Sequence, residues 1–96
     1  MLIYKDGPYQ VKKSKRDYIL INTKGSYENH GHLKRFKTCK KVISLLKREI
    51  VPQSKYLRGT VLRVSTNEKY IEKVKIKIEK DKQKQYYFNS QKGVRK

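Results

Sequence analysis

Short apolar runs with the composition of β-strands mark the N-terminal third of the chain. The strongest run is residues 18–21, which is continuous, aromatic and β-branched. Residues 9–11 precede it, across a polar turn at residues 12–17. The pattern therefore predicts a β-hairpin over residues 9–22, and it indicates a loop over residues 25–32.

Residues 33–51 carry the clearest helical pattern. At about 100° per residue, apolar side chains fall in one stripe of such a helix and cations fall on the opposite side. The stripe comprises Phe36, Cys39, Val42, Ile43, Leu46 and Ile50. The basic face comprises Lys34, Lys37, Lys40, Lys41, Lys47 and Arg48. We expect this helix to stop before Pro52, which disfavours helical geometry in Val51, and to pack its stripe on the hairpin.

A second helix is predicted over residues 55–64, where Ser54 can cap the first turn. Gly59 makes such a helix less stable by up to ~1 kcal/mol relative to Ala. A strand over residues 60–65 is therefore the alternative. The spacing of the first two helices permits a helix-turn-helix, although no turn glycine supports one.

A third helix is predicted to open at residue 65 or 66 and to run to about residue 80. Residues 73–78 also alternate between Lys and apolar residues with a period of two. Because that period is typical of a strand, a strand paired with residues 86–88 is the alternative.

The chain of 96 residues is long enough for one domain with one modest core. The predicted elements place it in the α+β class, with an N-terminal β-hairpin packed against two or three helices over residues 1–90. Residues 91–96 are expected to form a mobile tail. No apolar run approaches the ~20 residues of a membrane-spanning helix or the length typical of a signal peptide, and Cys39 is the single cysteine. These features favour a cytoplasmic protein that does not contact a membrane.

Charge is the feature that points to a function. The chain has 26 Lys and Arg against 8 Asp and Glu, a formal net charge of +18. Such a charge repels itself, and the candidate partners are nucleic acid, an anionic membrane surface or an acidic protein. Its 20 Lys and 6 Arg favour diffuse matching to phosphates over bidentate reading of bases. We therefore expect a nucleic-acid partner, with an acidic protein as the alternative, and the oligomeric state stays open.

Two groups of cations are the main candidates for contact with phosphates. The first is the basic face of residues 34–48, whose alternative role is an ordinary solvated helix face. An ordinary face interleaves Glu with Lys, but here only Glu49, at the end of the element, does so. The second is the hairpin turn, which either reaches a nucleic acid or simply keeps the turn soluble. It carries Lys12, Lys13, Lys15 and Arg16.

Two arginines and two tyrosines are further candidates. Arg58 and Arg63 could contact bases or ribose 2′-hydroxyls, or they could pack over an edge of the core. Tyr86 and Tyr87 could stack on unpaired bases. Alternatively they serve the core, because the chain has no Trp and only 2 Phe.

Two histidines in the expected loop raise the question of catalysis or metal binding. Together with Glu28 and Cys39, His30 and His32 match no structural zinc spacing. They could also act as acid and base in a small ribonuclease that holds the phosphate with neighbouring cations. The chain has no phosphate-binding glycine loop, serine nucleophile motif or acidic cluster for two-metal chemistry. We therefore expect exposed histidines, no catalytic residue, no metal and no cofactor.

Residues 38–48 and 54–58 resemble in style the small Lys-rich proteins of bacteriophages and mobile elements. The resemblance extends over most of the chain and rests on no diagnostic motif. It implies the cytoplasm of a host cell and a regulatory or anti-host role. The expected function is therefore non-catalytic binding of DNA or RNA. The alternatives are an inhibitor that binds an acidic or nucleic-acid-facing surface of a host protein, and a small ribonuclease or toxin.

Overall fold

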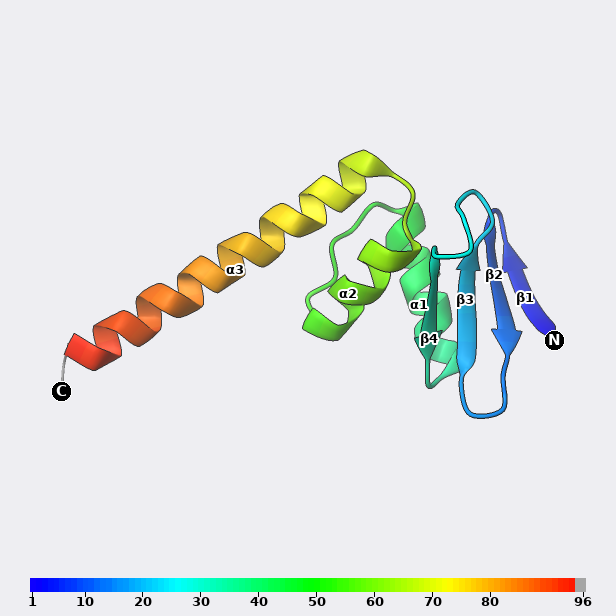
Figure 1. Cartoon of the computed structure of the whole chain (residues 1–96), viewed down its shortest axis with the longest axis horizontal. Coiled ribbons are helices and arrows are strands. Elements are labelled where there is room, and N and C mark those ends of the chain that lie inside the picture. The colour runs from blue at the N-terminus through cyan, green and yellow to red at the C-terminus, as the bar shows by residue number, and fades with distance from the viewer. Residues whose placement is uncertain (95–96) are drawn as a thin grey trace.

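The computed structural model describes the backbone of residues 1–94 and the side chains of residues 1–82. Four antiparallel strands come first and three helices follow (Figure 1). In chain order the elements are β1 (Leu2–Asp6), β2 (Tyr9–Lys13), β3 (Tyr18–Asn22), β4 (His30–Leu33), α1 (Phe36–Lys47), α2 (Lys55–Val64) and α3 (Glu68–Val94). The predicted α+β class is confirmed.

Each strand pairs with its neighbour in the chain, so the sheet has the order β1-β2-β3-β4. The predicted hairpin is its centre, β2 and β3, and the sequence did not reveal the two outer strands. Val11 of β2 lies opposite Leu20 of β3, and both side chains are fully buried beneath the helices. These two residues therefore fix which face of the sheet forms the core.

The prediction of a loop over residues 25–32 is wrong for residues 30–32, which belong to β4. Gly31 of this strand pairs with Leu20, and its missing side chain leaves room for α2. A Cβ at this position would lie 3.1 Å from the side-chain methyl of Thr60, closer than ordinary packing allows. A sequence that looks like a turn is therefore a strand on which a helix lies closely.

Helix α1 begins at Phe36 and ends at Lys47, so it is shorter at both ends than the prediction of residues 33–51. Leu33 belongs to β4 instead, and the chain turns at Glu49, whose φ of 54° lies in the left-handed region. The predicted contact of the apolar side of this helix with the sheet is confirmed. Cys39, Val42, Ile43 and Leu46 are buried in one core with Val11, Leu20 and Leu33.

Helix α2 spans the predicted residues 55–64, and the Ser54 side chain accepts a hydrogen bond from the Leu57 amide. The strand alternative for residues 60–65 is therefore wrong. Residues 48–54 connect α1 to α2. This connection is longer than the 3–4-residue turn of a helix-turn-helix, so these two helices do not form that motif.

Helix α3 is longer than predicted, and the strand alternative for residues 73–78 is wrong. Asn67 opens it, because its side-chain oxygen accepts hydrogen bonds from the amides of Lys69 and Tyr70. Tyr70 and Val74, one turn apart, are buried, and Ile78 packs against the same core. Beyond Asp81, which bonds to Arg58 of α2, the helix extends away from the body of the protein (Figure 1). Of the tail that was expected to be mobile, residues 91–94 are helical and residues 95–96 lie outside the described residues. No helix within residues 1–94 is long and apolar enough to cross a membrane.

Candidate nucleic-acid interface

The outward side of α1 carries Lys37, Lys41 and, just beyond the last turn, Arg48. All three are exposed, on the side of the helix opposite its buried residues. No acidic residue lies in α1. This set, called the α1 stripe below, keeps the position that the sequence predicted.

Two other cations of the predicted basic face are turned toward β1 and already have partners. The Lys40 ammonium lies 5.6 Å from the centre of the Tyr4 ring and 5.8 Å from that of Phe36. The Lys47 ammonium donates a 2.9 Å hydrogen bond to the Asp6 carboxylate, and this bond raises the pKa of Lys47. The surface that α1 offers to a polyanion is therefore narrower than the helical pattern indicated.

A second group of cations gathers at the end of the sheet where β2 turns into β3. Tyr18, the first residue of β3, pairs with Leu33, the last residue of β4. The β2–β3 turn and the connection from β4 to α1 therefore lie at the same end of the sheet (Figure 1). The hairpin-end cluster, as we call it, comprises Lys12, Lys13, Lys15, Arg16, Lys34 and Arg35, all exposed.

The acid within this end of the domain is Asp17, and it is already engaged. Its carboxylate lies 3.0 Å from the Nδ1 atom of His32. Like Lys40, Lys13 is exposed but has partners: its ammonium lies 4.7 Å from the centre of the Tyr18 ring and donates a 2.9 Å hydrogen bond to the Ser14 carbonyl oxygen. The hairpin end therefore presents positive charge with little opposing negative charge.

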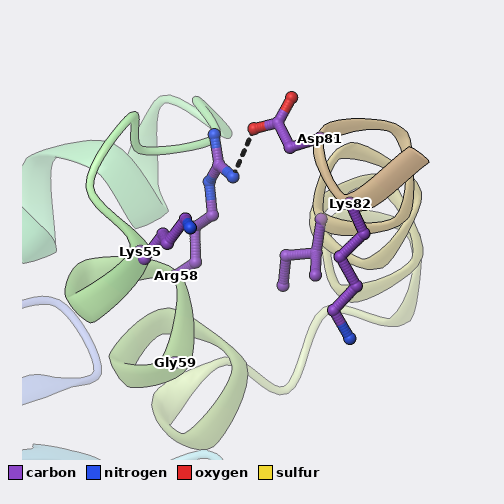
Figure 2. A pocket seen from close by; sticks show the side chains of 6 residues that line it. Lys55, Arg58, Gly59, Asp81 and Lys82 are labelled. Atoms are coloured by element: carbon purple, nitrogen blue, oxygen red, sulfur yellow. Dashed lines mark hydrogen bonds and ion pairs between the residues drawn. The ribbon is translucent and has the colours of Figure 1, made fainter. Parts of the chain in front are cut away.

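Arg58 is a structural residue and does not belong to the interface. It is only 4% exposed, and its Nε donates to the Pro52 carbonyl oxygen at 2.8 Å. Its guanidinium also donates to the Asp81 carboxylate of α3 at 2.6 Å, and this bond lowers the pKa of Asp81 (Figure 2). Beside the pair, a mostly apolar hollow of about 340 Å³ separates α2 from α3 at Gly59. Of the two roles expected for Arg58, the structure shows the packing role.

Arg63 is exposed and lines a hollow of about 260 Å³ between β4 and α2. His32, Tyr56 and Thr60 line the same hollow. A larger hollow of about 550 Å³ lies on the other side of Tyr56, between α2 and the start of α1. We call the two hollows the seam groove, because both follow the seam between α2 and its neighbours β4 and α1.

Two asparagine side chains hold the sheet and α2 together beside the seam groove. The buried Asn22 amide donates to the Val64 carbonyl oxygen at 2.9 Å, and the Asn29 amide donates to that of Arg63 at 3.0 Å. Both acceptors belong to the last turn of α2, whose carbonyl groups have no partner within the helix. These bonds therefore fix α2 against the sheet, and these two elements form the walls of the smaller hollow.

His30 and His32 lie side by side in β4, with ring centres 5.3 Å apart. The Nδ1 atom of His30 lies 2.7 Å from the Tyr27 carbonyl oxygen. The Nδ1 atom of His32 lies 3.0 Å from the Asp17 carboxylate. Cys39 lies in the core, where burial raises the pKa of its thiol to about 11. Among the described residues, no group of three or more His, Cys, Asp or Glu side chains could hold a metal ion.

Of the remaining candidates, the side chains of Tyr86 and Tyr87 lie outside those that the structure describes. Tyr56 is a residue that the sequence analysis missed. It shares one side of α2 with Thr60 and Arg63, away from the buried Leu57, and this helical spacing could have drawn attention to it.

Comparisons with known proteins add no assignment to this geometry. No family model, no curated protein and no solved structure gave a significant match to this chain. The function must therefore be argued from the charge, the burial and the contacts of the residues themselves.

Proposed function

We propose that this protein binds nucleic acid, mainly through its phosphates, with the hairpin-end cluster and the α1 stripe. The observation that carries the proposal is the grouping of six exposed cations at one end of the sheet, where the Asp17 carboxylate already bonds to His32. Nucleic acid carries condensed cations, and a basic surface of this kind releases them when it contacts the phosphates, which favours binding. The net charge of +18 has the same consequence for the whole chain.

Lys residues supply most of the charge, and this bears on specificity. A Lys ammonium is a point charge that contacts a phosphate without reading the adjacent base, whereas bidentate base contacts favour Arg. Of the two arginines in α2, Arg58 is buried and paired, so only Arg63 is exposed to a ligand. We therefore propose binding that tolerates many sequences, without catalysis. A cytoplasmic location belongs to the same proposal, and the single, buried thiol of Cys39 supports it.

A binding titration of the whole chain tests the proposal. Duplex DNA, single-stranded DNA and structured RNA are each titrated at ~50 mM salt, where phosphate contacts are strong. We expect binding to at least one of these probes, and we expect the purified protein to carry material that absorbs at 260 nm and leaves in high salt. Failure to bind any probe would overturn the proposal. It would favour the alternative of an inhibitor that uses the same cations on an acidic protein surface.

The two histidines of β4 support a second candidate, cleavage of RNA. Each imidazole has an oxygen partner at Nδ1, which leaves its Nε2 atom for proton transfer, and the rings lie 5.3 Å apart. A ribonuclease needs such an acid and base near a bound phosphate. The hollow that His32 lines does not include His30, so we retain binding as the main proposal.

Changing His30→Ala together with His32→Ala separates the two functions. Under the binding proposal, the double variant keeps an affinity within a few-fold of the wild type, because phosphate contacts come from Lys and Arg. Incubation of labelled RNA with the wild type should leave the RNA whole. Cleavage by the wild type that disappears in a folded double variant would instead establish the ribonuclease.

A further inference from the structure

The seam groove combines an exposed aromatic ring with cations on both sides of it. Tyr56 lines both hollows and is 62% exposed. On one side of the ring lie Lys34, Arg35 and Lys41, and on the other side lies Arg63. No acidic residue is among the residues that line the two hollows.

The Tyr56 ring is held in place although it is exposed. Its hydroxyl donates a 3.2 Å hydrogen bond to the His32 carbonyl oxygen of β4. The two asparagine bonds described above fix the last turn of α2 against the sheet. A ring that is already oriented loses little conformational freedom when a ligand stacks on it.

Gly59 lines the smaller hollow beside Tyr56 and adds no side chain to it. A Cβ added at this position would meet no atom within 4 Å, so Gly59 faces open space. Hydroxyl groups of Thr60 and, in the larger hollow, Thr38 and Ser54 are hydrogen-bonding groups along the same path. The groove therefore combines an aromatic ring, hydroxyl groups and positive charge along its length.

We propose that the seam groove binds a single strand of nucleic acid, with one unpaired base stacked on Tyr56 and with the flanking phosphates on Lys41 and Arg63. This inference rests on the proposed function and adds the strand form of the ligand. Stacking on aromatic side chains together with a cationic groove is how proteins hold single strands with little sequence preference. A duplex keeps its bases stacked inside the helix, so it has no base to place on Tyr56.

Fluorescent oligonucleotides of about 12 nucleotides test the proposal, a length within the range that single-strand sites cover. The probes are oligo(dT), oligo(rU) and a duplex of the same length, and the whole chain is used. We expect the wild type to prefer the single strands, and the comparison of the first two probes distinguishes DNA from RNA. Tyr56→Ala should lower single-strand affinity by roughly 5- to 150-fold, the range for loss of one stacked base, and should leave duplex affinity unchanged.

Two matched variants control for loss of structure and for loss of any tyrosine. Tyr56→Phe keeps the ring and removes only the bond that orients it to His32, so it should retain most of the single-strand affinity and lose far less than Tyr56→Ala. Tyr27→Ala removes a ring that is 90% exposed but lines neither hollow, so it should bind like the wild type. Circular dichroism of each variant confirms that the fold is kept.

A fluorescent base analogue gives a second measurement that needs no variant. With 2-aminopurine at the centre of oligo(dT), stacking on Tyr56 should change its emission when the wild type binds. Equal binding of single strand by the wild type and a folded Tyr56→Ala variant, or unchanged emission on binding, would overturn the inference. The proposed function would survive either of these results, whereas failure of the wild type to bind any probe would remove both.

Discussion

Changing Lys37, Lys41 and Arg48 together to Glu should weaken binding to duplex DNA on the order of 100-fold at ~100 mM salt. If each residue contacts one phosphate, loss of three contacts makes the negative slope of log K against log salt shallower by about 3. The effect should be alike for all sequences, because these contacts read no bases. Stability should change little, since all three side chains are exposed and such changes usually cost under ~0.5 kcal/mol each.

A triple variant of α3 provides the control for net charge. Lys69, Lys75 and Lys82 are exposed on α3, and none of them lines the hollow that Arg48 borders. Changing them to Glu lowers the net charge by the same six units, from +18 to +12. If charge alone governs binding, both variants lose affinity equally. If the α1 variant binds like the wild type, the assignment of phosphate contacts to α1 is wrong. The cations that bind the phosphates then lie in the hairpin-end cluster.

Tyr70→Ala should be the most destabilising change in α3, with a loss of about 3–5 kcal/mol in the free energy of unfolding. The Tyr70 side chain is 2% exposed, and its hydroxyl donates a 2.6 Å hydrogen bond to the Ile50 carbonyl oxygen. The substitution therefore leaves a cavity and detaches α3 from the loop that follows α1. Since small domains have only about 5–15 kcal/mol of stability, urea unfolding should show a large shift in midpoint.

Tyr70→Phe separates the hydroxyl from the ring. It keeps most of the buried area, so we expect a loss of about 0.5–1.5 kcal/mol, the typical net contribution of one hydrogen bond to stability. The difference between Phe and wild type should also depend on pH. Burial raises the pKa of Tyr70 from 10.0 to about 12, so its contribution is complete below pH 10 and is lost as the pH rises to 12. Urea curves at pH 8 and pH 11.5 measure this; an equal difference at both values would contradict the role of the hydroxyl.

The elements that the sequence predicted well are those with a local cause. Ser54 caps α2, and the apolar stripe of α1 appears at helical spacing, so both helices follow from neighbours in the chain. Strand β4 has no such pattern, because His30, Gly31 and His32 form a strand only through pairing with β3 and the close approach of α2. Strand β1 also depends on its partner, because it pairs with β2 and its register is irregular between Leu2 and Tyr4.

For the candidate interface too, the sequence predicted the features with a local cause and missed those that depend on distant residues. The sequence alone indicates where positive charge is concentrated, because Lys and Arg without neighbouring acids are visible in it. It does not indicate which cations have partners, since Asp6 lies 41 positions from Lys47 and Asp81 lies 23 positions from Arg58. Nor does it show that the hairpin turn and residues 34 and 35 lie at one end of the sheet, which depends on the pairing of Tyr18 with Leu33.

The salt dependence of binding by the wild type tests the central claim most directly. Affinity for duplex DNA is measured by fluorescence anisotropy between ~50 and ~200 mM salt, and log K is plotted against log salt. With about six phosphates contacted by the hairpin-end cluster and the α1 stripe, we expect a slope near −5 on duplex DNA and near −4 on a single strand. A flat plot, or no binding at ~50 mM salt to either form, would contradict the proposal that this surface binds nucleic acid through its phosphates.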